Sequence, residues 1–393
     1  TAMKGGHIFV RAVFDWTLRS AAMPSPGLAA LEWLTWQPFL LAPNRVYRVY
    51  RGGALLDKFQ GKPAGEDGHF PEDWIGSTTV TRIAGRPPDE GLSRVPLPDG
   101  SMVALKSLIE KYPEAMLGTG HVASHGKELG VLCKLLDAAM RLPIQCHPDR
   151  SFARQYLGSE FGKTESWLIL ATRMIGGEPP SILFGFREGL TEKDFRRMVQ
   201  AQDIPAQVAA LNRVEVRPGE VYLVSAGMPH AIGSGVFMVE VQEPTDFVVN
   251  TEYTVGEIRR TEAQCFMGLG FDLGMRCFNY EAVGMEYVQK HTLHPRIVQD
   301  GEAGREEVLI GSGDTPCFGA GRLMVRGTVP DRDRGRCYIG IVTEGNGSLT
   351  SPGLDIPLRT GATFFVPAAS RHESYQASPG DPLTVIKCFP PSA

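Results

Sequence analysis

The sequence lacks paired cysteines, an excess of charge of one sign, and any apolar run long enough to cross a membrane. Its seven cysteines are scattered without a CxxC pair, so neither a disulfide framework nor a thiolate zinc cluster is predicted. The 40 basic and 44 acidic residues are mixed along the chain, and the formal charge is −4. Such a surface holds neither phosphate backbone nor anionic lipid. We therefore expect no nucleic-acid or membrane partner, and a reducing, cytoplasmic location.

The most apolar early stretch also lacks the features of a targeting segment. "LAALEWLTWQPFLLAP" carries Glu32, is shorter than a bilayer-spanning helix and follows no charged n-region. Its apolar residues lie at near-helical spacing and end at Pro43. We expect residues 1–42 to form a partly helical extension. What the chain does have is length, because 393 residues with 42% hydrophobic content suffice for two or three domains.

Most of the remaining sequence has the pattern of short strands separated by Gly and Pro turns. Two segments, about 104–140 and 190–213, have helical or mixed character, and the second is predicted to hold two short helices. "GEVYLVSAG" at 219–227 resembles "GATFFVPA" at 361–368. Each has a Gly-led turn, an apolar strand and a small-residue corner followed shortly by histidine. Two copies of one small barrel would explain this similarity.

The duplicated pattern predicts a mainly β chain made of two jelly-roll domains with helical insertions. Antiparallel strands that close into a double-sheet roll lose their exposed edges and leave a mouth where side chains from several strands converge. We expect a catalytic domain at 43–285, which contains both insertions, and a second, metal-free domain of the same kind at 286–393.

Candidate metal ligands are dispersed over three segments of the first domain. In "LPIQCHPD", Gln145 and His147 are two residues apart on a predicted strand, so their side chains share one face. "FGKTESWLIL" places Lys163 and Glu165 on one face, where a buried carboxylate and ammonium would need each other or a cation. His230 follows a Gly-Met-Pro corner and is aimed at the barrel mouth.

Taken separately, these residues have ordinary alternatives: a surface ion pair for Lys163 and Glu165, and a turn histidine for His230. Taken together, two imidazoles, one carboxylate and one amide oxygen suit a borderline divalent ion, with zinc the best match and an open position for a substrate oxygen. The prediction requires all four side chains to meet at the barrel mouth.

The ordered segments that carry these residues resemble the type I mannose-6-phosphate isomerases, zinc-dependent enzymes of the cupin superfamily. The likeness runs over most of residues 43–290, through "KLLDAAMRLPIQCHPDRSFA", "GKTESWLIL" and "LNRVEVRPGEVYLVSAGMPHAIGSGVFMVEVQEPTD". A cupin-like (double-stranded β-helix) domain follows. The resemblance implies one zinc ion per chain, with the ligands Gln145, His147, Glu165 and His230.

The resemblance also implies a substrate pocket next to the metal. Lys134 and Lys163 fall on lysines that line this pocket, Glu240 on an acidic residue of the active-site strand, and Asp246 on an aspartate after that strand. Exchanging an aldose and a ketose passes through an enediolate, whose charge a Lewis acid stabilises while a base moves the proton between carbons. We expect Glu240 to be this base, with Lys163 as the second candidate, and Lys134 to bind a phosphate or sugar hydroxyl.

Two positions depart from the family's pattern on the side expected to handle the phosphate. Ten residues after Glu240 the family has an arginine, where this chain has Asn250 in the substrate pocket. An amide supplies neither a permanent positive charge nor a bidentate fork for phosphate. The family's serine two residues before the glutamine ligand is replaced by Pro143. Arg259 and Arg260 lie downstream, where the sequence favours a solvated loop.

The expected function is therefore a zinc-dependent isomerase that interconverts mannose 6-phosphate and fructose 6-phosphate, with a small sugar or sugar phosphate as partner. Because of Asn250, two alternatives stay open: isomerisation of an unphosphorylated sugar, and a metal-retaining cupin that binds or senses sugar without turnover. A cupin dioxygenase would rather use iron, so the Gln and Glu ligands disfavour it. Other histidines have no matched partner set and are expected to be structural: His69, His121, His125 and His372.

Overall fold

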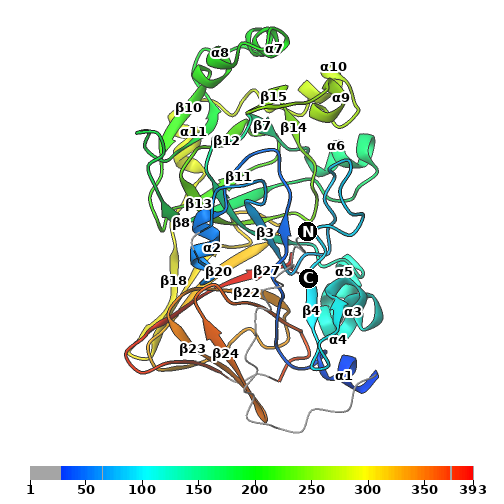
Figure 1. Ribbon diagram of the computed structural model, residues 1–393, viewed down its shortest axis with the longest axis vertical. Helices are drawn as coiled ribbons and strands as arrows, with labels where there is room; N and C mark the ends of the chain where they lie inside the picture. The colour runs from blue at the N-terminus through cyan, green and yellow to red at the C-terminus, as the bar shows by residue number, and fades with distance from the viewer. Residues whose placement is uncertain (1–27, 64, 372–373, 393) are drawn as a thin grey trace, which may run out of the picture.

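The computed structural model describes residues 28–63, 65–371 and 374–392. Residues 1–27 of the expected extension and His372 lie outside the described residues. Strands make up most of the regular structure, which confirms the prediction of a mainly β chain. Figure 1 shows two groups of strands stacked along the long axis of the molecule. No helix among the described residues is both long enough and apolar enough to pass through a membrane.

The first roll pairs a seven-stranded with a five-stranded antiparallel sheet. The larger sheet has the order β17-β11-β8-β13-β6-β3-β2 and the smaller β10-β9-β12-β7-β14. Apolar side chains such as Trp167, Phe184 and Met238 fill the space between them. The strands of the larger sheet are β2 (Arg45–Val46), β3 (Glu72–Ile75), β6 (Leu132–Ala138), β8 (Glu165–Thr172), β11 (Val221–Val224), β13 (Val236–Gln242) and β17 (Thr292–Leu293). Those of the smaller are β7 (Gln145–Cys146), β9 (Ser181–Phe186), β10 (Leu211–Glu215), β12 (His230–Ile232) and β14 (Val249–Asn250).

The second roll repeats this plan with a seven-stranded sheet, β1-β25-β22-β27-β20-β19-β18, and a four-stranded sheet, β21-β26-β23-β24. Its interior holds Tyr338, Phe364 and Val385. The two similar segments of the sequence form β11 and β25, as two copies of one barrel require. The larger sheet comprises β1 (Phe39–Leu40), β18 (Arg296–Gly301), β19 (Gly304–Ile310), β20 (Gly319–Val325), β22 (Tyr338–Glu344), β25 (Thr363–Val366) and β27 (Leu383–Phe389). The smaller comprises β21 (Thr328–Pro330), β23 (Asn346–Ser351), β24 (Leu354–Arg359) and β26 (Ser374–Ala377).

The two seven-stranded sheets pack back to back. One core cluster contains Leu135 and Val239 from the first roll together with Ile339, Phe365 and Ile386 from the second. Along each strand, alternate side chains belong to different cores because successive residues point to opposite faces of a sheet. On β6, for example, the side chains next to Leu135 point into the first roll. This alternation decides which side chains reach the interior of that roll.

Short helices and two small ribbons connect the sheets. The second expected insertion contains two short helices, as predicted, and each begins at a side-chain cap, Thr191 or Asp203. The helices are α1 (Leu28–Trp33), α2 (Ala54–Phe59), α3 (Leu105–Lys111), α4 (Pro113–Leu117), α5 (Thr119–His125), α6 (Arg150–Phe152), α7 (Glu192–Gln200), α8 (Ile204–Ala209), α9 (Glu262–Cys265), α10 (Phe271–Met275) and α11 (Gly284–Lys290), with a π-helical turn at Ala153–Leu157. The ribbons are β4 (Arg94–Pro96) with β5 (Met102–Ala104), and β15 (Thr254–Val255) with β16 (Ile258–Arg259).

The first expected insertion, 104–140, is helical only in part. Helices α3, α4 and α5 occupy 105–125, but 132–138 form β6, a central strand of the larger sheet. All seven residues of β6 are buried. A strand with cores on both sides carries apolar residues on both faces, so its period of two is hidden and the helical expectation there is wrong.

Candidate metal centre and active site

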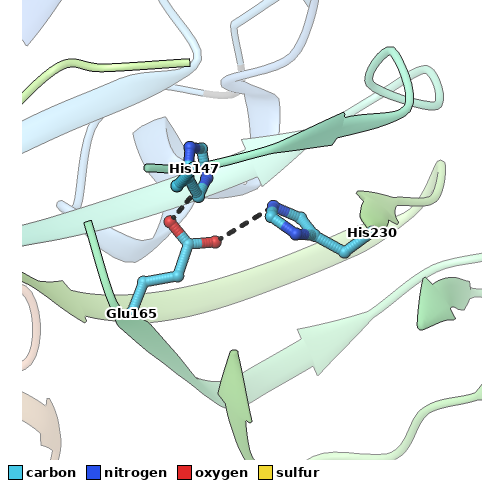
Figure 2. Close-up of side chains that lie close together, drawn as sticks. All are labelled: His147, Glu165 and His230. Carbon is cyan, nitrogen blue, oxygen red and sulfur yellow. Dashed lines mark ion pairs between the residues drawn. The ribbon is translucent and has the colours of Figure 1, made fainter. Parts of the chain in front are cut away.

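Three of the four predicted metal ligands converge inside the first roll. His147 follows β7, Glu165 begins β8 and His230 begins β12. Their ligand atoms all lie within 4.8 Å of one another, and all three side chains are buried. His147 Nε2 is 3.1 Å from Glu165 Oε2, and His230 Nε2 is 3.4 Å from Glu165 Oε1. Figure 2 shows both rings turned toward the carboxylate between them.

The hydrogen bonds of the two imidazoles suit them for metal binding. Nδ1 of His147 lies 2.9 Å from the carbonyl of Phe247, and Nδ1 of His230 lies 2.8 Å from that of Met228. Because a carbonyl only accepts, each Nδ1 carries the proton and each Nε2 presents a lone pair to Glu165. Nε2 of His230 has no hydrogen-bond partner among the described residues.

Electrostatics keep these rings neutral, which is the form that binds metal. Burial and the Lys163 ammonium lower the pKa of His147 to about 3, although Glu165 opposes them. Burial also lowers the pKa of His230. Two lone pairs and a carboxylate that face one another at this distance need a cation between them. The donor set therefore fits a divalent ion.

Among the described residues, Lys163 supplies the one positive charge that touches the triad. Its Nζ lies 2.8 Å from Glu165 Oε2 and 2.9 Å from His147 Nε2. Lys163 and Glu165 thus form a buried pair, and the alternative of a surface ion pair is wrong. His230 is fully buried in a strand rather than in an exposed turn.

The strand pairing places the backbone of the predicted amide ligand, Gln145, next to that of the triad residue His230. Gln145 of β7 is directly opposite His230 of β12 on one side and Asn250 of β14 on the other. Directly opposite residues project from the same face of a sheet. Gln145 is half-buried and Asn250 is buried. Coordination by Gln145 stays a prediction.

The predicted base lies between the two predicted lysines. Glu240 of β13 is opposite Lys134 of β6, and its Oε2 is 3.2 Å from the Lys134 ammonium. Its Oε1 is 3.8 Å from Lys163 Nζ. Burial raises the pKa of Glu240 to about 8, and Glu165 acts in the same direction while both lysines oppose the shift. A carboxyl group with such a pKa can exchange a proton near neutral pH.

Further buried charges support Lys134, and two of the residues that carry them, Glu72 and Arg48, were not predicted from the sequence. Glu72 of β3 accepts hydrogen bonds from Trp74 Nε1, at 2.7 Å, and from the Tyr50 hydroxyl. Arg48 lies 3.0 Å from Glu72 through Nε and bonds both oxygens of Asp246. The segment "EDWIG" could have indicated Glu72. On a strand, Glu72 shares a face with Trp74, and a carboxylate buried beside a tryptophan needs a partner that balances its charge.

The remaining polar residues considered from the sequence make contacts away from the triad. Arg259 is exposed on β16, and Arg260 donates to the carbonyl of Glu252 at 2.6 Å. A ring nitrogen of His69, His121 and His125 contacts a backbone carbonyl in each case. Such contacts agree with structural roles.

Sequence and structure comparisons point to the same group of proteins. Over 245 residues, 62% of this chain and 70% of the relative, the chain is 25% identical to the mannose-6-phosphate isomerase ManA of Bacillus subtilis. Over 134 residues, 34% of this chain and 38% of the relative, it is 33% identical to the mannose-6-phosphate isomerase of Streptococcus mutans. No model of a protein family matches the sequence.

Solved structures share the fold along almost the whole chain. The mannose 6-phosphate isomerase of Bacillus subtilis has a TM-score of 0.69 at 20% identity, covering 89% of this chain and 99% of that one. A variant of the phosphomannose isomerase from Salmonella typhimurium has a TM-score of 0.67 at 17% identity, covering 91% and 100%. These likenesses establish the duplicated cupin fold, and the resemblance predicted from the sequence is confirmed.

Proposed function

We propose that this chain, which has the cupin fold of the phosphomannose isomerases, is a zinc-dependent aldose–ketose isomerase that interconverts mannose 6-phosphate and fructose 6-phosphate. One observation carries the proposal: a buried carboxyl with a raised pKa, Glu240, lies between two lysines, and one of them, Lys163, contacts the His147–Glu165–His230 triad. A base, cations and a candidate metal-binding triad in one buried cluster are what an enediolate pathway needs.

The metal would be held by Nε2 of His147, Nε2 of His230 and the Glu165 carboxylate, with Gln145 as the fourth ligand. Imidazole, carboxylate and amide oxygen without thiolate suit zinc among the borderline divalent ions. When bound, the ion would supply Lewis-acid stabilisation of the enediolate oxygens. A divalent ion would also replace the Lys163 ammonium as the counterion of the triad.

The chain's own groups would carry the proton. Ionised Glu240 would take the proton from one carbon of the substrate and return it to the neighbouring carbon. The Lys134 ammonium, 3.2 Å away, holds the carboxylate in place. Burial alone would lower the pKa of Lys134, but Glu240 and Glu72 raise it, so the ammonium stays charged and can also bind a substrate oxygen. Lys163 lies on the other side of Glu240 and can donate to the developing oxyanion.

Isomerisation of an unphosphorylated sugar is the second candidate function, and one observation favours it. Asn250 is buried directly beside Gln145, at the position where the resemblance places an arginine of the family. The cations that surround Glu240 are already paired with carboxylates. Phosphate binding would thus depend on Lys134 or on groups outside this cluster.

The experiment is a coupled assay of fructose 6-phosphate formed from mannose 6-phosphate by the zinc-loaded protein. Mannose is tested in parallel, with fructose as the product detected. His147→Ala is the control without a complete metal site. Turnover of mannose 6-phosphate supports the proposal, and turnover of mannose alone supports the second candidate. Saturable sugar binding without any turnover would instead indicate a sensor.

All seven cysteines are free and buried. Together with the charge pattern, this supports our proposal of a reducing, cytoplasmic compartment.

A further inference from the structure

A row of alternating charges leads from Asp246 to the proposed base. Arg48 bonds Asp246 at 3.1 and 3.2 Å and lies 3.0 Å from Glu72. Lys134 Nζ is 3.8 Å from Glu72 Oε2 and 3.2 Å from Glu240 Oε2. The side chains of Glu72, Lys134 and Glu240 are more than nine-tenths buried, and those of Arg48 and Asp246 are each 11% exposed. This burial strengthens each interaction relative to water.

Within this row, the Glu72 carboxylate is fixed in place. It accepts hydrogen bonds from Trp74 and Tyr50, and both donors are buried. It is also ionised: burial alone would raise the pKa of Glu72, but Arg48 and Lys134 lower it to about 2. A fixed, ionised carboxylate in the interior must be matched by cations.

The Lys134 ammonium, by contrast, can move. It ends a flexible four-carbon stem and lies between two carboxylates, nearer to Glu240 than to Glu72. Arg48 and Lys134 are the only ion-pair partners of Glu72 among the described residues. Removal of Arg48 would leave Lys134 as the sole cation for Glu72 and would shift the ammonium away from Glu240.

We propose that Arg48 is a positioning residue: by neutralising Glu72 and Asp246, it leaves the Lys134 ammonium in contact with Glu240. Arg48 reaches Glu240 only through Glu72 and Lys134, so it acts on the reaction indirectly. The inference rests on the proposed function, because it concerns the alignment of the proposed base. It explains why the chain buries an arginine between two carboxylates that are 174 residues apart.

The test compares Arg48→Met with the double variant Arg48→Met/Glu72→Gln. For the single variant we expect kcat to fall by about 100-fold, the loss typical of a misplaced group, with a smaller change in KM. In the double variant Glu72 carries no charge to attract Lys134, so kcat should recover at least tenfold. Arg48→Lys should retain more activity than Arg48→Met. A purely structural role for Arg48 predicts no recovery in the double variant, and that result would overturn the proposal.

Arg322→Met is the matched control, because Arg322 also bridges to a buried carboxylate, Glu307, but in the second roll. It should cost stability without changing kcat. Zinc content is measured for every variant and should stay unchanged.

If the wild type shows no turnover, the proposed function has failed, and the positioning role is decided by crystal structures. In Arg48→Met, or Arg48→Gln should the methionine variant not fold, Lys134 Nζ should lie closer to Glu72 than to Glu240. An ammonium that remains beside Glu240 would contradict the proposal.

Discussion

At the scale of single residues, we propose that Asn250 determines the choice of substrate. It is buried on β14, directly opposite Gln145 of β7. Arginine at this position would add a permanent charge and a planar fork of donors for phosphate. We therefore expect Asn250→Arg to raise kcat/KM for mannose 6-phosphate relative to mannose by about tenfold, equivalent to about 1.4 kcal/mol.

The measurement is a pair of steady-state assays with the two sugars on zinc-loaded protein. Asn250→Gln is the control, because it keeps an amide and adds only length. A ratio that does not change in Asn250→Arg, at unchanged zinc content, would show that the phosphate is bound elsewhere.

The raised pKa of Glu240 leads to a prediction of how the reaction depends on pH. As the proposed base, Glu240 would act only when ionised, and burial, together with Glu165, raises its pKa to about 8. We expect kcat/KM to rise about tenfold per pH unit below pH 8 and to level off above it. Lys134 does not contribute to this profile, because its pKa is raised and it stays charged. Glu240→Gln should lower kcat by a factor of about 100 or more. A profile that is flat between pH 6 and 9 would exclude Glu240 as the base.

The site residues that could be predicted from the sequence are those that form pairs close together along the chain. Gln145 with His147, and Lys163 with Glu165, are pairs at the two-residue spacing of a strand. His147, Lys163 and Glu165 are buried in contact with one another, and Gln145 is half-buried. Arg48 gave no such signal, because its partners Glu72 and Asp246 are 24 and 198 residues away along the chain. Only the closed roll brings them together.

At the scale of the elements, the candidate metal-binding triad lies between two sheets. His230 belongs to the five-stranded sheet of the first roll, His147 directly follows strand β7 of that sheet, and Glu165 belongs to the seven-stranded sheet. A bound ion would therefore link sheets that otherwise meet through apolar packing. Strand β6 shows the limit of prediction at this scale, because its apolar residues on both faces have no period from which a strand can be recognised.

Because a bound ion would connect the two sheets of the first roll, we expect zinc to stabilise the protein against heat. An ion that binds only the folded state adds about 2.7 kcal/mol when its free concentration is 100 times its Kd. Removal of metal with a chelator should lower Tm, and added zinc should restore it, as measured by calorimetry with metal analysis. His147→Ala should abolish this zinc-dependent shift, whereas His125→Ala, at a half-buried histidine outside the triad, should keep it. Equal shifts in both variants would place the stabilising metal elsewhere.

At the scale of the whole molecule, the sequence predicted two similar barrels but not how they meet. The repeated Gly-led strand segments identify β11 and β25 as equivalent. The back-to-back packing depends on outward-facing side chains such as Leu135 and Ile386, and an apolar residue does not specify its partner. The pairing of β1 with β25 likewise joins the start of the described chain to the second roll, a contact that no local pattern indicates.

The shared core predicts that the two rolls unfold together. Ile386 and Val385 are neighbours on β27, but Ile386 packs against the first roll and Val385 fills the interior of the second. We expect Ile386→Ala to cost about 2–5 kcal/mol and Val385→Ala somewhat less, because each leaves a cavity and valine loses fewer methylene groups. If the back-to-back interface couples the rolls, both variants should show a single calorimetric transition at a lower temperature. Loss of isomerase activity on heating should follow that transition in both, although neither residue touches the site. Were the rolls independent, Val385→Ala would produce a separate early transition with activity retained through it, and that result would contradict the coupling.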